Sequence, residues 1–255
     1  MVHFVGAGPG APDLITVRGK KLIGEADVII YAGSLVNPQL LAYAGPSCEI
    51  HNSAYMTLEE TTAVIRKAES KGKMTVRLHT GDPSIYGAIA EQMHELDLQG
   101  IRYDVCPGVS SFVAAAAVMN QEYTKPGISQ SVIITRAAGR TPVPEAESIG
   151  SFAAHKATMV LFLSAGKWKE CREQLLAGYA EDTPAAIVYK ATWEDERIIR
   201  CTVGTLAETG EASGITGTAL IMVGAVLGEE APKSKLYDAG FETGFRKAHA
   251  GKDQR

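Results

Sequence analysis

The chain has 255 residues, of which 45% are hydrophobic and 21% are charged, and its formal net charge is −4. This composition predicts a folded globular protein with one large or two small domains, and it disfavours nucleic acid as a partner because phosphate binding needs a basic surface. No apolar run reaches the roughly eighteen residues that span a bilayer, and we expect no signal peptide. The lack of a long apolar run also predicts no membrane partner. Because the 4 cysteines are scattered with no Cys-x-x-Cys pair, we expect a cytoplasmic protein with no disulfide frame or metal site.

Strands alternate with helices along the first half of the sequence. Strands are predicted at 2–6, 26–32, 48–51, 74–78 and 102–105, and helices at 16–25, 57–70, 86–98 and 112–119. The first helix is capped by Thr16, and the second begins with a capping box, Thr57-Leu-Glu-Glu60. This alternation predicts a mostly parallel sheet whose loops carry the ligand.

A linker at 120–128 leads into a second unit with more varied connections. Strands are predicted at 130–136, 157–163, 185–190, 197–202 and 219–224, helices at 167–178 and 204–210, and a long polar loop at 137–147. Because hairpin-like and crossover connections alternate here, we expect a mixed sheet. The predicted organisation is an N-terminal α/β domain at 1–119, a C-terminal α/β domain at 129–228 and a polar tail at 229–255.

Gly6, Gly8 and Ala11 fit the G-x-G-x-x-A fingerprint of dinucleotide-binding folds. The next strand, however, ends in Tyr31, where an Asp or Glu should bind the ribose of the dinucleotide. Pro9 also removes one of the backbone donors that would hold a pyrophosphate. These two mismatches disfavour a dinucleotide-dependent oxidoreductase, which stays as an alternative.

Three glycine-bearing loops follow strands of the first half, at Gly6–Gly10, Thr80–Pro83 and Pro107–Ser111. In the second loop Gly81 lets the backbone come close to a ligand, and Asp82 supplies a carboxylate. Parallel strands place such loops at one edge of the sheet, where they form a crevice for a nucleoside-like ligand. S-adenosylmethionine fits this description, because its sulfonium activates its own methyl group and the enzyme acts mainly by positioning.

Five segments together carry a resemblance to a known family. They are Gly6-Ala-Gly-Pro-Gly10, Asp13-Leu-Ile-Thr16, His79-Thr-Gly-Asp-Pro-Ser-Ile-Tyr-Gly87, Pro107-Gly-Val-Ser-Ser111 and Tyr189-Lys-Ala-Thr-Trp193. In this order, over about residues 2–226, the sequence resembles the tetrapyrrole methylases. Tyr31-Ala-Gly-Ser-Leu-Val36 and Thr135-Arg-Ala-Ala-Gly-Arg-Thr-Pro-Val-Pro-Glu145 further resemble the precorrin-4 C11-methyltransferases of cobalamin biosynthesis.

The resemblance implies two α/β domains of the tetrapyrrole methylase type, with S-adenosylmethionine in the cleft between them, and a homodimer. Matched by motif position, the cofactor contacts are expected at Pro9, Thr80, Gly81, Asp82, Ile85, Ser110, Ser111, Leu163, Ala191 and Ala219. Ala11 stands where many relatives carry Asp, and we expect this difference to alter a solvent contact near the first glycine loop without abolishing the site.

The implied substrate is a precorrin, which carries many acetate and propionate side chains. An acidic protein must gather cations to hold such a molecule. Arg136, Arg140 and Lys190 are the candidate cations, and for each the alternative is a solvated surface charge.

Three other residues are candidate substrate contacts, and two are candidates for catalysis. Tyr31, His79 and Tyr86 are expected near the substrate, with a packing or structural role as the alternative for each. Asp82 and Arg136 are the catalytic candidates. For Asp82, ordering of its loop is favoured over proton removal, because the enamine-like carbon of the macrocycle already supplies the nucleophile.

The expected reaction transfers a methyl group from S-adenosylmethionine to C11 of precorrin-4, which gives precorrin-5 and S-adenosylhomocysteine. Methylation of cobalt-precorrin-4 is the alternative within the family, and the tail with Tyr237-Asp-Ala-Gly-Phe241 favours the cobalt-free substrate. A non-catalytic tetrapyrrole carrier is an alternative from another class, as is the oxidoreductase.

Overall fold

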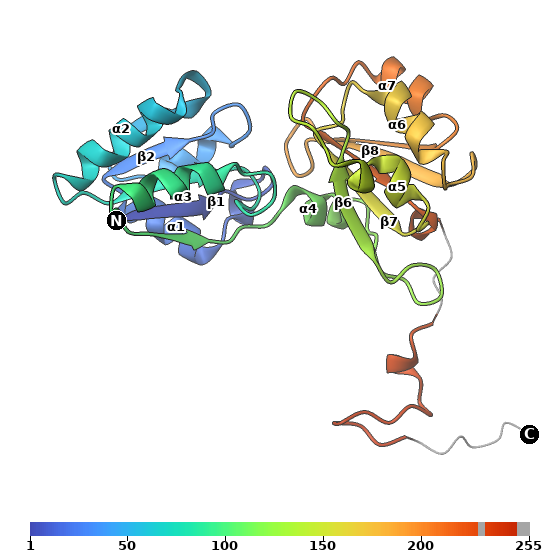
Figure 1. Ribbon diagram of the computed structural model, residues 1–255. Coiled ribbons are helices and arrows are strands. Elements are labelled where there is room, and N and C mark those ends of the chain that lie inside the picture. Colours follow the sequence, from blue (N-terminus) through green and yellow to red (C-terminus); the bar gives the residue numbers. More distant parts are fainter. Residues whose placement is uncertain (229–232, 249–255) are drawn as a thin grey trace, which may run out of the picture. The chain divides into compact units, whose positions relative to one another are not determined.

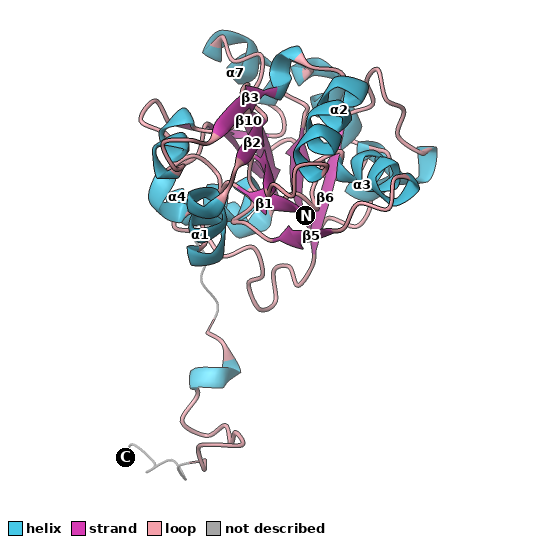
Figure 2. Ribbon diagram, turned by 90° about the vertical axis from the view of Figure 1, so that its left-hand side faces the viewer, coloured by secondary structure: helices cyan, strands magenta, loops and turns pink. Residues whose placement is uncertain are grey.

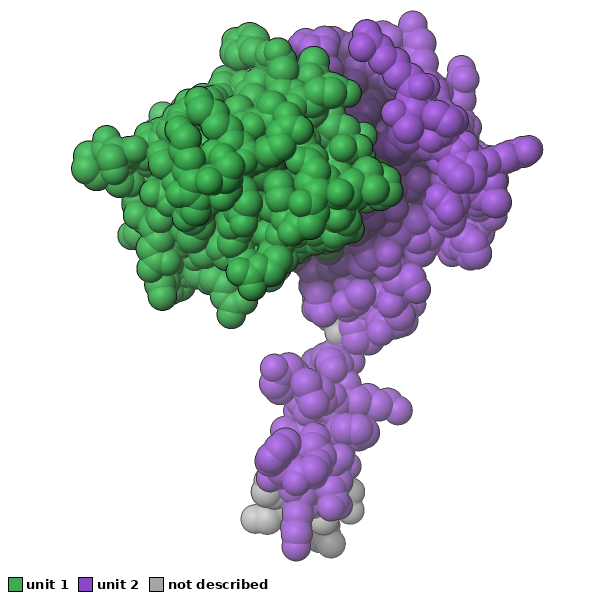
Figure 3. Space-filling model, turned by 60° about the vertical axis from the view of Figure 1, so that its left-hand side comes forward, with its two compact units in different colours: residues 1–119, 188–197 green, residues 120–187, 198–255 purple. Residues whose placement is uncertain are grey.

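The computed structural model describes residues 1–228 and 233–248 and divides the chain into two compact units. The first unit comprises residues 1–119 and 188–197, and the second comprises residues 120–187 and the described residues from 198 onward (Figure 3). The domain boundaries expected from the sequence stay a prediction. Within the described residues, no helix is both long and apolar enough to cross a bilayer.

The first unit contains a sheet in which every pairing is parallel (Figure 1). Its strands are β1 (Val2–Gly6), β2 (Val28–Tyr31), β3 (Glu49–Asn52), β4 (Thr75–His79) and β5 (Tyr103–Cys106), in the order β3-β2-β4-β1-β5. The buried strands are rich in β-branched residues, as expected for a sheet covered on both faces. The mostly parallel N-terminal sheet predicted from the sequence is confirmed.

Helices cover both faces of this sheet. They are α1 (Val17–Glu25), α2 (Leu58–Glu69), α3 (Ile89–Leu98) and α4 (Ser111–Val118). Because successive strand residues point to opposite faces, Ile29 packs with Ile23 of α1, while Ile30 packs with Ile65 of α2 and Leu96 of α3. Figure 2 shows α1 on one side of β1 and β2, and α2 and α3 on the other.

The first two helices begin where the sequence predicts. The Thr16 hydroxyl accepts a hydrogen bond from the first turn of α1. At the start of α2 the capping box is complete, since the Thr57 N–H donates to the Glu60 carboxylate at 2.8 Å and the Glu60 N–H donates to the Thr57 hydroxyl at 3.2 Å. Local side-chain chemistry therefore sets these two starts.

The third helix begins later than predicted. We expected it from Tyr86, but α3 starts at Ile89. Tyr86 and Ala88 have φ angles of 55° and 50°, which are left-handed and cannot be part of a right-handed helix. The residues before Ile89 therefore form a turn at the carboxyl end of β4.

The second unit contains a mixed sheet, as predicted. Its strands are β6 (Val132–Arg136), β7 (Thr158–Phe162), β8 (Pro184–Tyr189), β9 (Arg197–Thr202) and β10 (Ala219–Val223), in the order β6-β7-β10-β8-β9. β6 and β7 are parallel, whereas β7 and β10 are antiparallel. The helices are α5 (Ile149–Ala153), α6 (Trp168–Leu175) and α7 (Leu206–Ser213), of which the short α5 was not predicted. Short 3-10 helices lie at Pro12–Leu14, Pro38–Tyr43, Ser53–Tyr55, Glu145–Glu147, Ala225–Leu227 and Lys235–Tyr237.

The chain reverses its direction across the first sheet between β2 and β4. From β2 it continues to β3 on one side, whereas from β4 it crosses β1 to reach β5 on the other. In open α/β sheets, a crevice for ligands forms at such a switch point, outside the carboxyl ends of the strands. The edge that carries the three glycine loops is thus also the edge at which this topology opens a crevice.

Candidate functional site

The three glycine loops meet main chain against main chain at the ends of β1, β4 and β5. A Cβ atom added to Gly6 would lie 2.6 Å from the Cα of Gly108 and 2.7 Å from the carbonyl oxygen of Gly81. A Cβ added to Gly108 would lie 2.2 Å from that same oxygen. Only glycine fits at these two positions, because the backbones approach more closely than any side chain allows.

Hydrogen bonds join the first loop to the second. The N–H of Gly8 donates to the carbonyl of Gly81 at 3.2 Å, and the N–H of Gly81 donates to the carbonyl of Gly8 at 2.8 Å. Gly8 and Gly81 have φ angles of 79° and 60°, which glycine adopts without strain. The Ala7 N–H also donates to the carbonyl of His79 at 2.7 Å. The two loops therefore form one rigid surface.

Asp82 joins the second loop to the third. One of its carboxylate oxygens accepts hydrogen bonds from the N–H and hydroxyl of Ser84, and the other accepts from the N–H of Gly108 at 2.8 Å. Partial burial raises the pKa of Asp82, but the bonds from the Ser84 hydroxyl and from the Gly108 and Ser84 N–H groups outweigh it, so the net pKa is lowered. A carboxylate with a lowered pKa and occupied oxygens is a weak base, so the geometry favours loop ordering as its role.

Residues 188–197 cover the first glycine loop. The indole N–H of Trp193 donates to the carbonyl of Pro9 at 2.9 Å, and the Ala11 N–H donates to the Thr192 hydroxyl at 3.0 Å. A Cβ on Gly10 would lie 2.2 Å from the Trp193 ring. Because the N–H groups of Gly8 and Ala11 both donate within the protein, the first loop has few donors left for a pyrophosphate, which disfavours the dinucleotide alternative.

Thr192 and Trp193 had no role in the sequence interpretation, although Trp193 ends one of the quoted motifs. The available signal was Gly10, because a residue without a side chain leaves room for the large Trp193 ring. Asn37 was also missed, and its side-chain amide donates to the carbonyl of Gly10 at 2.9 Å. All three residues hold the first glycine loop through hydrogen bonds, and no local sequence motif links them to that loop.

A pocket of about 270 Å³ lies at the ends of β2 and β4, on the face that α2 and α3 cover. Four of the predicted site residues line it, namely His79, Thr80, Ile85 and Tyr86. Tyr31 instead packs against the hydrophobic core of the opposite face. The structure thus brings together candidate cofactor contacts and candidate substrate contacts in one pocket.

His79 is the most unusual of these residues. His79 is only 5% exposed, and its Nε2 atom has no hydrogen-bond partner within residues 1–228 and 233–248. Burial, and to a lesser degree the charge of Arg77, lower the pKa of His79 to about 3, so the ring is neutral at physiological pH. Arg77 and Gln92 also line the pocket, and sequence reasoning missed both. The signal for Arg77 was a charged residue inside a strand that is otherwise suited to burial.

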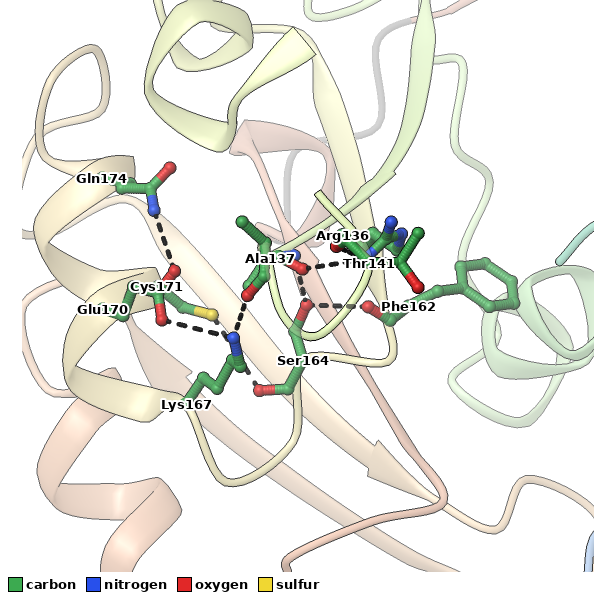
Figure 4. A network of polar contacts seen from close by, with 10 residues as sticks. Arg136, Ala137, Thr141, Phe162, Ser164, Lys167, Glu170, Cys171 and Gln174 are labelled. Carbon is green, nitrogen blue, oxygen red and sulfur yellow. Dashed lines mark hydrogen bonds and ion pairs between the residues drawn. The ribbon is translucent and has the colours of Figure 1, made fainter. Parts of the chain in front are cut away.

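Arg136 is engaged by its own loop in the second unit. Its guanidinium donates to the carbonyl of Thr141 at 3.1 Å (Figure 4). It also donates to the carbonyl of Pro142 at 3.0 Å. The Ser164 hydroxyl accepts from the N–H of Ala137 at 2.8 Å at the start of the same loop. Lys167 also donates to this loop, at the carbonyl of Ala138. Arg136 therefore shapes the loop after β6 with most of its donors.

Lys190 and Arg140 differ in how much of their charge is available. The Lys190 ammonium lies 2.6 Å from the Asp195 carboxylate, and it also contacts the Tyr189 and Trp193 rings. Hydrogen bonds to Asp195 and Tyr189 raise the pKa of Lys190. Arg140 is exposed. Of the three predicted substrate cations, Arg140 is the one whose charged group is least engaged by other groups of the protein.

The remaining predicted cofactor contacts divide between the two units. Gly81 lies beside Ser110 and Ser111, at the start of α4, within the first unit. Leu163 and Ala219 belong to the second unit, and Leu163 is 64% exposed with a left-handed φ of 51°. Within the described residues, no three His, Cys, Asp or Glu side chains gather as a metal site. The contacts of these residues with a cofactor stay predictions.

We predict that Gly108→Ala destabilises the first unit by about 3 kcal/mol or more, because the added methyl group overlaps backbone atoms that cannot move aside. Gly45→Ala is the matched control, since its nearest neighbour would lie at 3.8 Å. Urea denaturation of both variants measures the difference. Equal stability of Gly108→Ala and wild type would show that the loops are not held in contact.

We predict that Asp82→Asn lowers the free energy of unfolding by about 1–2 kcal/mol at neutral pH, because its amide cannot accept all three hydrogen bonds. Since the pKa of Asp82 is lowered on folding, its stabilisation is complete above the ordinary value of 3.8 and disappears as the pH falls through the lowered value. Denaturation of wild type and variant between pH 7 and pH 2 measures this effect. A difference in stability that persists at the acid end would contradict it.

Comparisons with known proteins agree with the sequence motifs. Residues 1–207 match the family described as Tetrapyrrole (Corrin/Porphyrin) Methylases. The chain is 54% identical to a cobalt-precorrin-4 C(11)-methyltransferase of Methanocaldococcus jannaschii, over 97% of this chain and 96% of the relative. It is 44% identical to a precorrin-4 C(11)-methyltransferase of Sinorhizobium sp, over 96% of this chain and 98% of the relative.

Solved structures share the fold. A cobalt precorrin-4 methyltransferase superposes with a TM-score of 0.87 at 48% identity, over 89% of this chain and 95% of that one. A uroporphyrin-III C-methyltransferase from Thermus thermophilus in complex with S-adenosylhomocysteine superposes with a TM-score of 0.76 at 28% identity, over 89% of this chain and 98% of that one. On its motifs, its two sheets and these similarities, the chain belongs to the tetrapyrrole methylase family.

Proposed function

We propose that the protein transfers a methyl group from S-adenosylmethionine to C11 of precorrin-4, giving precorrin-5 and S-adenosylhomocysteine in cobalamin biosynthesis. The observation that carries this proposal is the similarity, over almost the whole chain, to two enzymes named for methylation at C11 of this macrocycle. The complex of a related methyltransferase with S-adenosylhomocysteine supports the choice of cofactor. The cytoplasmic location and the homodimer stay predictions.

The grouping of the first-unit residues fits a nucleoside-like cofactor. Thr80, Gly81 and Asp82 form one loop, and Ser110 and Ser111 lie directly beside it. When bound, S-adenosylmethionine supplies an electrophilic methyl group on a positively charged sulfur. The chain's own contribution is to hold a rigid loop surface in place, so that little conformational entropy is lost when cofactor and substrate are aligned. Asp82 acts in this scheme as a positioning residue.

Methylation of cobalt-precorrin-4 is a second candidate function. The relative at 54% identity carries the cobalt-containing name, whereas the relative at 44% carries the cobalt-free one. The tail that favoured the cobalt-free substrate holds its own shape, because Arg246 donates to the carbonyls of Leu236, Asp238 and Phe241. This local arrangement gives no contact that distinguishes the two substrates.

Incubation of the purified protein with labelled S-adenosylmethionine and either precorrin-4 or cobalt-precorrin-4 tests the proposal. We expect a product one methyl group heavier, with the new carbon located at C11 by carbon NMR, and no transfer to precorrin-3A. Binding of the macrocycle without methyl transfer would instead support a carrier. Thermal stabilisation by NAD or NADP, but not by S-adenosylhomocysteine, would support an oxidoreductase.

We predict that the two loop arginines affect the enzyme differently. Arg140→Gln should raise the KM for the macrocycle several-fold and change stability by less than about 0.5 kcal/mol, because this side chain is exposed. Arg136→Gln should lower stability by about 1–2 kcal/mol, because it frees loop carbonyls from their donor. Arg18→Gln, an exposed change on α1, is the control for loss of charge. Steady-state kinetics and thermal melts measure both effects, and equal behaviour of the three variants would contradict the assignment.

A further inference from the structure

Arg77 carries a buried positive charge that the described part of the chain does not neutralise. Its side chain is 7% exposed, its Nε donates to the Gln92 side-chain oxygen at 2.9 Å, and its Nη1 donates to the carbonyl of Ile30 at 3.1 Å. No carboxylate of residues 1–228 or 233–248 forms an ion pair with it. Burying a guanidinium with two neutral partners and no carboxylate is costly, and an anionic ligand would offset this cost.

His79 adds a second incomplete polar group to the same pocket. Arg77 and His79 are two residues apart on β4, so they point to the same face of the sheet. Both residues line the pocket of about 270 Å³, and the buried Nε2 atom of His79 has no hydrogen-bond partner among the described residues. Buried polar atoms in native proteins are almost always hydrogen-bonded, so an unpartnered one in a pocket wall points to a ligand.

The position and size of the pocket limit what this ligand can be. It lies between the ends of β2 and β4, where the strand order reverses and ligands enter open α/β sheets. Its volume is slightly below the range of pockets that enclose a whole drug-sized molecule, so it suits one arm of a macrocycle. The single carboxylate in its lining, Glu91, belongs to an exposed residue, whereas Arg77 is deep in the wall.

We propose that this pocket is a subsite for one acetate or propionate side chain of the substrate. Arg77 provides the cation, His79 donates a hydrogen bond through Nε2, and Gln92 is a positioning residue that fixes the guanidinium. The inference rests on the proposed function for the identity of the substrate. It adds a charge-recognition site in the first unit to the arginines expected in the second.

Gln92→Glu tests the subsite with a side chain of the same size, although it replaces the amide that donates to the Ala88 carbonyl at 2.9 Å. The new carboxylate pairs with Arg77 and neutralises the charge that the substrate arm would meet. In the full-length protein we expect binding of uroporphyrin III, a stable porphyrin with acetate and propionate side chains, to weaken about tenfold or more in a fluorescence titration. The KM for precorrin-4 should rise similarly, with little change in kcat or in affinity for S-adenosylhomocysteine. Gln39→Glu, the same change at an exposed residue of the first unit that does not line this pocket, should match wild type.

His79→Leu is the second variant, in case the new glutamate disturbs the fold. Because it removes an unpartnered buried polar atom, the free protein should melt at the same temperature or higher, while porphyrin binding weakens. If His79 served only the fold, its replacement would lower the melting temperature and the porphyrin affinity together. Equal porphyrin affinity of wild type, Gln92→Glu and His79→Leu would overturn the subsite, whether or not the protein methylates precorrin-4. Weaker porphyrin binding without methyl transfer in the wild type would keep the subsite and overturn the proposed function.

Discussion

The close contact of Gly6, Gly81 and Gly108 is the constraint on which the rest of the first unit depends. It holds the ends of three parallel strands so close that their backbones touch, and this contact restricts the conformations of the loops that follow. Asp82 then ties two of these loops together through hydrogen bonds to main-chain donors. A surface built in this way is already ordered before a ligand arrives, and a preordered site loses less entropy on binding.

Electrostatics in this acidic protein depend on which cations are already paired. Arg136 donates to the carbonyls of its own loop, and Lys190 is paired with Asp195. These contacts hold the loops in which the two residues lie, although only Lys190 is paired with a carboxylate. Arg77, which looked like an ordinary strand residue, has no carboxylate partner in the described chain and faces a pocket. The subsite that we propose thus places its cation inside the sheet and not on a surface loop.

Much of this fold could be predicted from local sequence, because its strands and capped helices follow simple rules. The Thr57 capping box fixed the start of α2, and alternation of strands with helices predicted the parallel sheet. The start of α3 could not be predicted, because the left-handed φ at Ala88 arises from the packing of the turn and has no side-chain signature. The bond from Trp193 to Pro9 joins residues far apart in sequence, so no window of neighbouring residues contains it.

Left-handed backbone at non-glycine residues recurs where strands end. Tyr86 lies in the turn after β4, Leu163 directly follows β7, and Lys190 directly follows β8, with φ angles of 55°, 51° and 48°. Each such residue costs on the order of 1 kcal/mol, and a glycine would avoid that cost. The strands before them are almost wholly buried, so their packing can hold a strained residue in place. All three are residues that we expect from the sequence to contact a ligand, so the strained backbone coincides with the predicted site.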